Sequence, residues 1–178
     1  MSNKKIQSAS YRKIGLPCIV ISISDVDAPP LRLAGNPDIR AVLRLNFADT
    51  GAGSPEAMQP ADAERIAAFV GAWEKDAQMI IVSCEAGISR SPAVAAAVMR
   101  ALGKNDMEIW KNPNYRPNSF CYRLTFRAFG FRCIFIHRRA AANRKAFRKC
   151  ASRIKNSAEP AVIWRQKKKR GKKWVRIR

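Results

Sequence analysis

The sequence lacks the features of membrane-spanning and of secreted, disulfide-linked proteins. Its 178 residues contain no apolar run near the roughly 20 residues that a spanning helix needs, which excludes a membrane span. The opening segment MSNKKIQSASYRK has no apolar signal region, and the five cysteines are an odd number without the spacing of a disulfide ladder. These absences predict a protein of the reducing cytoplasm.

Acidic residues are scarce at one end of the chain only. The formal net charge is +21, but residues 1–130 hold 16 Lys and Arg against 12 Asp and Glu, whereas residues 131–178 hold 18 against one. The second segment is too charged to bury much apolar surface. We therefore predict a single domain over residues 1–130 and a basic tail over residues 131–178, disordered or atypical, with nonspecific polyanion binding as its expected property.

Three apolar segments have the character of strands. Residues 16–24 are rich in β-branched side chains and end in a turn-forming stretch, and residues 41–47 form a second such segment. The run Met79–Ser83 is short and almost wholly apolar, which is typical of a central parallel strand covered on both faces.

Segments of helical character alternate with these strands. Apolar residues recur at helical spacing over residues 61–73, and a further helix is expected with Ser91 as its cap, Pro92 in its first turn and Gly103 at its end. Two more helices are expected, over residues 105–110 and 118–129. The alternation predicts an α/β fold with a central, mostly parallel sheet flanked by helices.

A cysteine six positions before an arginine is the candidate for the reactive site. This spacing occurs at Cys84 and Arg90, Cys121 and Arg127, and Cys133 and Arg139. Only the first pair follows a predicted strand, precedes a capped helix and encloses a glycine, Gly87, that tolerates an unusual turn. Backbone N–H groups and a helix N-terminus can then face an anion, as a phosphate cradle requires. For Cys121 and Cys133, a packing role is expected instead.

The loop from Cys84 to Arg90 combines a nucleophile with anion-binding groups. Inward N–H groups, the helix dipole and the Arg90 guanidinium all favour the thiolate of Cys84 over the thiol. The planar guanidinium can hold two phosphate oxygens in a transition state, which a lysine does less well. The alternative interpretation is a buried cysteine at a strand end beside a surface arginine.

The segment VSCEAGISRSPAVAAAV resembles the active-site signature of the protein tyrosine phosphatases, closest to the dual-specificity branch and its bacterial and phage relatives. The resemblance implies that Cys84 attacks phosphorus to form a phosphocysteine, and that the Ser91 hydroxyl eases departure of the thiolate. It also implies that backbone amides cradle the phosphate, contributed by Glu85, Ala86, Gly87, Ile88, Ser89 and Arg90. No metal or other cofactor is implied.

Two further site residues follow from this resemblance. In the family, an aspartate on a mobile loop upstream of the cysteine acts as general acid and then as general base, and Asp49, which opens the stretch DTGAGSPE, is our candidate. Asp38 and Asp62 are the alternatives. Asn118, in PNSFCYRL, either braces the phosphate loop by hydrogen bonding or simply caps a helix.

Ser83 departs from the family pattern. Relatives usually carry histidine immediately before the nucleophile, where it helps to organise the loop, whereas the single histidine here, His137, lies in the basic tail. A neighbouring hydroxyl can still donate a hydrogen bond to the loop. The substitution therefore predicts weaker thiolate formation and reduced activity.

The leading hypothesis is an enzyme that hydrolyses phosphate monoesters without a metal, on a phosphorylated protein or a small phosphate ester. Phosphotyrosine is the expected target, with phosphoserine and phosphothreonine as further substrates. One alternative is a phosphate-binding module with weak or no turnover, and another is a phosphatase of nucleic-acid 5′ phosphates guided by the basic tail. A sulfurtransferase of the rhodanese type and the small tyrosine phosphatases related to arsenate reductases fit less well, because their loops differ in length or in place along the chain.

Overall fold

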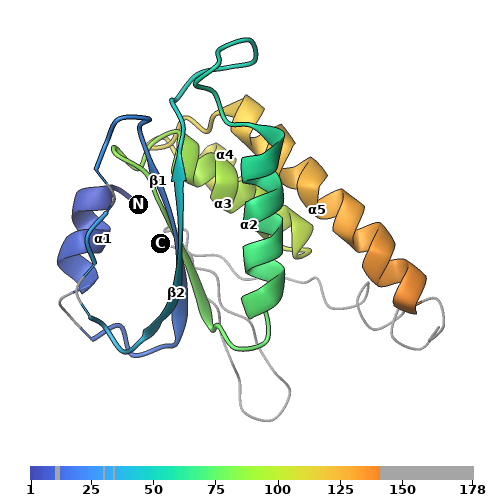
Figure 1. Ribbon diagram of the computed structural model, residues 1–178, viewed down its shortest axis with the longest axis horizontal. Coiled ribbons are helices and arrows are strands. Elements are labelled where there is room, and N and C mark those ends of the chain that lie inside the picture. Colours follow the sequence, from blue (N-terminus) through green and yellow to red (C-terminus); the bar gives the residue numbers. More distant parts are fainter. Residues whose placement is uncertain (11–12, 30, 34, 141–178) are drawn as a thin grey trace.

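The computed structural model describes residues 1–10, 13–29, 31–33 and 35–140, and it confirms the α/β class (Figure 1). Three parallel strands form one sheet in the order β2-β1-β3. The strands are β1 (Cys18–Ser24), β2 (Ile39–Asn46) and β3 (Met79–Ser83). The helices are α1 (Asn3–Ser10), α2 (Pro60–Trp73), α3 (Arg90–Ala101), α4 (Met107–Lys111) and α5 (Ser119–Ala140).

The sheet lies between a large and a small apolar core. The large core packs α2, α3 and α5 against one face, and the small core packs Ile6 of α1 against the other (Figure 1). α1 was not predicted from the sequence, because it is short and Ile6 is its only large apolar residue. Its local signal is Ser2, whose Oγ accepts a hydrogen bond from the Lys5 N–H at 3.4 Å and so caps the helix.

The prediction that β3 is a central strand is wrong. β1 occupies the centre of the sheet, and β3 pairs along its length with β1. All of β3 is nevertheless buried, because Ile80 and Val82 join the large core while Met79 and Ile81 join the small one. An apolar run reports that both faces of a strand are covered, and it says nothing of how many strands lie beside it.

The helix after β3 begins slightly earlier than predicted. Ser89 is its N-cap residue and Arg90 its first residue, so Ser91 lies inside the first turn with Pro92. The end is as predicted, since Gly103 has a φ of +70° and its N–H donates to the Arg100 carbonyl. All of α3 as far as Met99 is buried, as expected of a helix covered on every side.

The last helix, α5, continues past its predicted end at Phe129 as far as Ala140. Residues 141–178, most of the predicted basic tail, lie outside the described residues, and the domain boundary near Gly130 stays a prediction. None of the helices that the structure describes is both long enough and apolar enough to cross a membrane.

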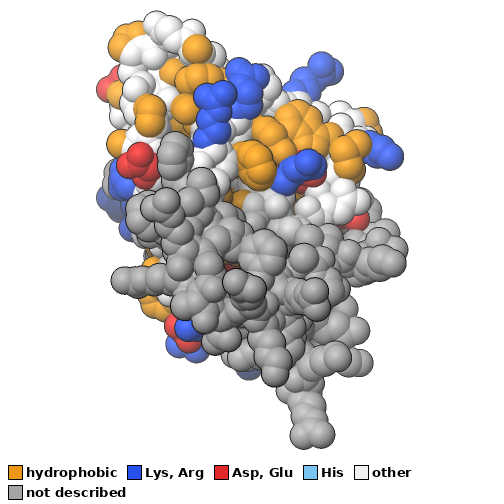
Figure 2. Space-filling view, turned by 90° about the vertical axis from the view of Figure 1, so that its right-hand side faces the viewer, with side chains coloured by type: hydrophobic (Ala, Val, Ile, Leu, Met, Phe, Trp, Pro, Cys, Tyr) orange, Lys and Arg blue, Asp and Glu red, His pale blue; other side chains and the backbone are white. Residues whose placement is uncertain are grey.

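An exposed aromatic cluster joins α4 to α5. The Trp110 and Tyr122 rings meet edge to face at 5.1 Å, and the Phe126 ring stacks on Tyr122 at 6.2 Å. Figure 2 shows apolar side chains mixed with Lys and Arg on the face over these helices. Beneath it, buried Asp106 accepts hydrogen bonds from Trp110 Nε1 at 3.2 Å and from the Tyr122 hydroxyl at 3.0 Å.

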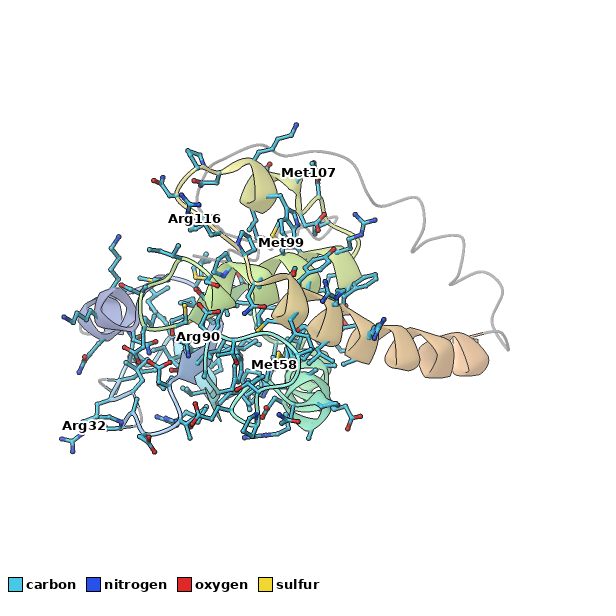
Figure 3. The ribbon with its side chains drawn as sticks, turned by 90° about the horizontal axis from the view of Figure 1, so that it is seen from above. Arg32, Met58, Arg90, Met99, Met107 and Arg116 are labelled. Carbon is cyan, nitrogen blue, oxygen red and sulfur yellow. The ribbon has the colours of Figure 1, made fainter. Side chains whose placement is uncertain are left out.

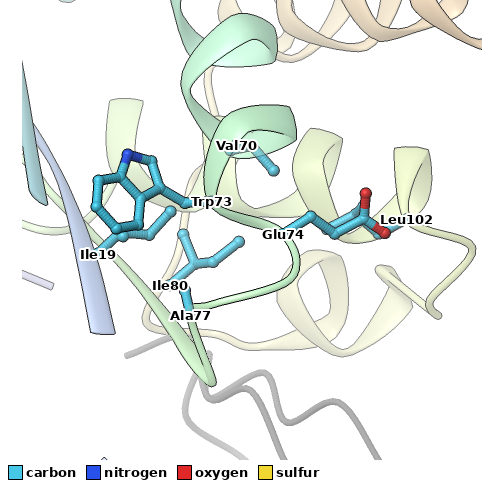
Figure 4. Close-up of a pocket in the computed structure, with 7 residues that line it drawn as sticks. All are labelled: Ile19, Val70, Trp73, Glu74, Ala77, Ile80 and Leu102. Atoms are coloured by element: carbon cyan, nitrogen blue, oxygen red, sulfur yellow. The ribbon is translucent and has the colours of Figure 1, made fainter. Parts of the chain in front are cut away.

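A small cavity of about 10 Å³ lies near the amino ends of β1 and β3 (Figure 4). Its lining is largely apolar and consists of Ile19, Val70, Trp73, Glu74, Ala77, Ile80 and Leu102. This volume has room for about one water molecule, so the cavity is too small to hold a substrate.

Candidate active site

The predicted phosphate loop connects β3 to α3 at the carboxyl end of the parallel strands, where ligands bind in open α/β sheets. Gly87 within it has a φ of +77°, in the left-handed region that glycine tolerates without strain. The backbone N–H groups from Glu85 to Ser89 donate to no group within the described ranges. A row of N–H groups in front of a helix N-terminus is available for an anion.

Cys84 lies at the start of this loop and is 2% exposed. Its Sγ is 3.1 Å from Ser91 Oγ, and the Ser91 N–H donates to it at 3.4 Å. Both contacts come from the first turn of α3, where the helix dipole favours negative charge. The two donors can stabilise a thiolate at this position.

Arg90 is buried behind the loop (Figure 3). Its Nη1 donates to the Phe47 carbonyl at 2.7 Å and pairs with Asp25 Oδ1, also at 2.7 Å. Its Nε is buried and has no hydrogen-bond partner in the part of the chain that the structure describes. The Nη1 end of the guanidinium is thus fixed, whereas the Nε N–H makes no hydrogen bond to the described residues. A buried, charged donor without an acceptor is costly in free energy, and a bound anion would supply the acceptor.

Asp25 was missed from the sequence. It directly follows β1, so it lies at the same edge of the sheet as Cys84, which follows β3. An acidic residue at the carboxyl end of a predicted strand is the signal that could have identified it.

Asp49 lies against the phosphate loop. Its Oδ1 accepts hydrogen bonds from Ser89 Oγ at 2.9 Å and from Asn118 Nδ2 at 2.8 Å. Asn118 Nδ2 also donates to the Thr50 carbonyl at 3.1 Å, which ties the loop after β2 to the start of α5. The structure therefore brings Asp49, Asn118 and the phosphate loop together.

Asn118 makes the contacts of both roles considered for it. Its Oδ1 accepts hydrogen bonds from the Phe120 and Cys121 N–H groups at 3.0 and 3.1 Å, as a helix N-cap does. Its backbone N–H donates to the Ser89 carbonyl at 3.3 Å, and the Arg116 N–H donates to the Ile88 carbonyl at 2.9 Å. The segment before α5 thus holds the second half of the phosphate loop.

The two alternative aspartates are engaged elsewhere. Asp38 Oδ2 accepts hydrogen bonds from the Ile14 and Gly15 N–H groups at 2.9 and 2.7 Å, just before the amino end of β2. Asp62 lies in the first turn of α2, where its Oδ2 accepts the Gln59 N–H at 3.0 Å. Both carboxylates thus accept hydrogen bonds from backbone groups outside the phosphate loop.

Ser83, which stands where relatives usually carry histidine, makes no side-chain hydrogen bond to the described part of the loop. Its Oγ is buried without a partner among the residues described. Side chains alternate along a strand, so Ser83 shares the face of Ile81, toward α1, whereas Cys84 belongs to the large core with Val82. The side chain of His137 lies outside the described residues.

The other described cysteines, Cys18 and Cys121, are fully buried in the small and the large core. Burial raises the pKa of the Cys18 thiol to about 12, with a smaller contribution from the negative charge of Asp38. Burial raises the pKa of the Cys121 thiol to about 12 as well, with a contribution from Asp49. Both are free thiols, and both are poor nucleophiles at neutral pH.

The first residues of the chain also contact the loop, which the sequence did not indicate. Ser2 forms an isolated parallel bridge with Cys84. Asn3 Nδ2 donates to Glu85 Oε1 at 2.9 Å, across 82 positions of sequence. No local pattern signals a contact of this range.

Comparison with solved structures identifies the fold. A putative dual specificity phosphatase from mouse, solved with zinc tungstate, is 17% identical, with a TM-score of 0.52 over 73% of this chain and 80% of that one. A variant of human DUSP28 is 19% identical, with a TM-score of 0.52 over 73% of this chain and 87% of that one. No family model and no curated protein matches the sequence. The described domain therefore has the fold of dual-specificity phosphatases, as the sequence resemblance implied, and its assignment to the bacterial and phage type stays a prediction.

Proposed function

We propose that this chain hydrolyses phosphate monoesters through a phosphocysteine intermediate on Cys84. One juxtaposition carries the proposal. The Cys84 sulfur lies at the start of a loop whose N–H groups have no partner among the described residues, beside a buried Arg90 whose Nε also has none there. A nucleophile and groups that bind an anion in its transition state thus occupy one place. The dual-specificity phosphatase fold is consistent with this chemistry.

In the first step, the Cys84 thiolate attacks phosphorus. The S–P bond forms as the bond from phosphorus to the leaving oxygen breaks, and the Asp49 carboxyl group gives its proton to that oxygen. Arg90 and the loop N–H groups hold the oxygens that carry the charge of the transition state. The hydrogen bonds that Asp49 accepts from Ser89, in the loop, and from Asn118 support this assignment.

In the second step, water attacks the phosphocysteine. The Asp49 carboxylate takes a proton from the water as the new P–O bond forms and the S–P bond breaks. Hydrogen bonds from the Ser91 hydroxyl, 3.1 Å from the sulfur, and from the Ser91 N–H stabilise the departing Cys84 thiolate. The free enzyme is then restored.

We infer phosphotyrosine as the preferred target among phosphoamino acids. Ile88 is 44% exposed within the loop, and Val26, beside Asp25, is 43% exposed. Apolar side chains on this end of the molecule favour an aromatic leaving group over a short alkyl one.

The test is hydrolysis of an aryl phosphate by the full chain at mildly acidic pH with a chelator present. We expect turnover that survives chelation and is lost in Cys84→Ser, while that variant still binds tungstate, the oxyanion held by the mouse protein. Turnover that survives in Cys84→Ser, or that disappears with the chelator, would overturn the proposal.

A phosphate-binding module without turnover is the second candidate. The observation in its favour is the buried, unpartnered hydroxyl of Ser83, since the loop lacks the support that the family's histidine gives. Folded protein that binds tungstate and shows no turnover would favour this candidate. Action on nucleic-acid 5′ phosphates depends on residues 131–178 and stays a prediction.

A further inference from the structure

We propose that Asn3 is a positioning residue of the phosphate loop, which holds the Glu85 carboxylate outside the anion cradle and fixes the Cys84 peptide. This inference rests on the proposed function, because it concerns the same loop. Its main readout is oxyanion binding, which can be measured whether or not the chain turns substrate over.

The main chain of the first residues holds both polar backbone groups of Cys84. The Asn3 N–H donates to the Cys84 carbonyl at 2.8 Å, and the Cys84 N–H donates to the Met1 carbonyl at 3.0 Å. β3 ends at Ser83, so this bridge pairs the residue after the strand with the N-terminal segment rather than with β1. The orientation of the nucleophile is therefore set by the N-terminal segment as well as by the sheet.

The Asn3 side chain connects the loop to the central strand. It is 6% exposed, and its Nδ2 donates to the Ile23 carbonyl of β1 at 3.2 Å and to Glu85 Oε1 at 2.9 Å. An amide nitrogen carries two protons, so it can serve both acceptors at once. The bond to Glu85 is charge-assisted and therefore stronger than a neutral one.

Glu85 needs such a restraint because of where its charge lies. It directly follows the nucleophile, and its N–H is one of the groups available to the anion. A free carboxylate at this position would repel a phosphate dianion and disfavour the thiolate. The bond to Asn3 keeps the carboxylate on the side where β1 ends.

The support behind Asn3 is rigid. α1 is anchored by Ile6, which is fully buried in the small core. The backbone before Asn3 also packs against the turn of the loop, since a Cβ at Gly87 would lie 2.5 Å from Ser2 N and 2.6 Å from Met1 C. The N-terminal segment thus contacts the loop at its start and at its middle.

Exchange of the hydrogen-bond donor at Asn3 and the acceptor at Glu85 tests this role. Tungstate binding to the full chain is measured for the wild type, Asn3→Asp, Glu85→Gln and the double variant Asn3→Asp with Glu85→Gln. We expect Asn3→Asp, which sets two carboxylates against each other, to weaken binding roughly tenfold, the scale of one lost charge-assisted hydrogen bond. The double variant has the net charge of the wild type and again sets a donor opposite an acceptor, so we expect it to recover most of the loss. Glu85→Gln alone should bind as well as the wild type or more tightly.

Two controls separate positioning from folding. Asn105→Asp makes the same chemical change at an exposed residue whose Oδ1 accepts only a local N–H, that of Met107 at 3.0 Å, and it should leave binding unchanged. Thermal melting shows whether each variant folds, and Asn3→Ala replaces Asn3→Asp if the latter does not. A merely structural role would lower the melting temperature without changing the tungstate affinity of the folded protein.

The outcomes distinguish this inference from the proposed function. Folded Asn3→Asp and Asn3→Ala with wild-type affinity would overturn the inference, as would a double variant that recovers nothing. Weakened binding with recovery in the double variant supports the inference even if the wild type shows no turnover, which would count against the proposed function alone. A wild-type chain that does not bind tungstate would overturn both.

Discussion

The Asn118 side chain donates a 2.8 Å hydrogen bond to Asp49 across 69 positions of sequence. The same side chain caps α5 by accepting the Phe120 and Cys121 N–H groups. One residue thus fixes the start of a helix and the place of the proposed general acid. Removal of Asn118 should therefore displace the acid without deleting it.

Replacement of Asp49 by Asn should lower kcat about 100-fold or more on phenyl phosphate, because the leaving oxygen then departs without a proton. The loss should be much smaller with a leaving group that needs no proton. Asn118→Ala should show the same dependence on the leaving group at a smaller magnitude. Steady-state kinetics on a series of aryl phosphates measures both effects. Asp62→Asn is the matched control, and an equal loss there would contradict the assignment.

Arg90→Lys should lower kcat/KM by about 100-fold or more, because an ammonium cannot reproduce the planar fork that donates from two nitrogens. Asp25→Asn should have a much smaller effect, since the arginine and its hydrogen bond to the Phe47 carbonyl remain. Kinetics and tungstate binding on both variants provide the comparison. Wild-type tungstate affinity in Arg90→Lys would show that the Nε edge of Arg90 does not bind the anion.

Iodoacetamide at about pH 7 to 8 should label Cys84 in the folded protein and leave Cys18 and Cys121 unmodified, because burial raises the pKa of each of the latter to about 12. Peptide mapping measures the labelling, and rapid labelling of Cys121 in folded protein would contradict the prediction.

In the unfolded chain the Cys18 and Cys121 thiols ionise near their ordinary pKa of 9.0. The unfolded state therefore releases protons that the folded state retains, so the contribution of these two thiols to stability should fall as pH rises from about 9 toward 12 and be constant below pH 9. Melting curves measured between about pH 8 and 12 check this dependence, and a melting temperature that does not fall over that range would contradict it.

Gly87→Ala should destabilise the fold by about 1 to 3 kcal/mol and weaken tungstate binding. Its φ of +77° is unfavourable for alanine, and the added Cβ would meet Ser2 N at 2.5 Å. Gly53→Ala is the matched control, since Gly53 has a φ of +95° and nothing within 4 Å of its Cβ position. Denaturant unfolding of both variants separates backbone strain from the contact. Equal destabilisation of the two variants would show that the N-terminal segment moves away from the added Cβ with no loss of stability.

Asp106→Ala should lower stability by about 1 to 3 kcal/mol, because Trp110 Nε1 and the Tyr122 hydroxyl lose the acceptor that they share. The pKa of Tyr122, raised mainly by burial and further by its hydrogen bond to Asp106, should move down but stay above its ordinary value. Trp fluorescence during unfolding and ultraviolet titration of tyrosine measure the two effects. Turnover per folded molecule should not change, and a large loss there would mean that the aromatic cluster affects the active site.

The residues that could be predicted are those whose signals are contiguous in sequence. A strand, a loop with Gly87 and a capped helix follow one another along the chain, so the placement of Cys84 and Arg90 required no knowledge of the rest of the fold. Asp25 and Asn3 reach the loop only because β1 lies beside β3 and α1 covers the sheet. The contact of Asn3 leaves no local pattern. The position of Asp25 just after a predicted strand was a signal, but its contact with Arg90 depends on strand order.

The bridge between Ser2 and Cys84 has a practical consequence for handling the protein. An extension ahead of Met1 would disturb the anion loop, because the Met1 amino group donates to the Val82 carbonyl at 3.2 Å and to Ser91 Oγ at 3.3 Å. A purification tag joined there would turn that amino group into an amide with one N–H, which cannot keep both hydrogen bonds. Tungstate binding measured on a tagged chain would then differ from that of the untagged chain, and cleavage that restores Met1 as the first residue should restore it.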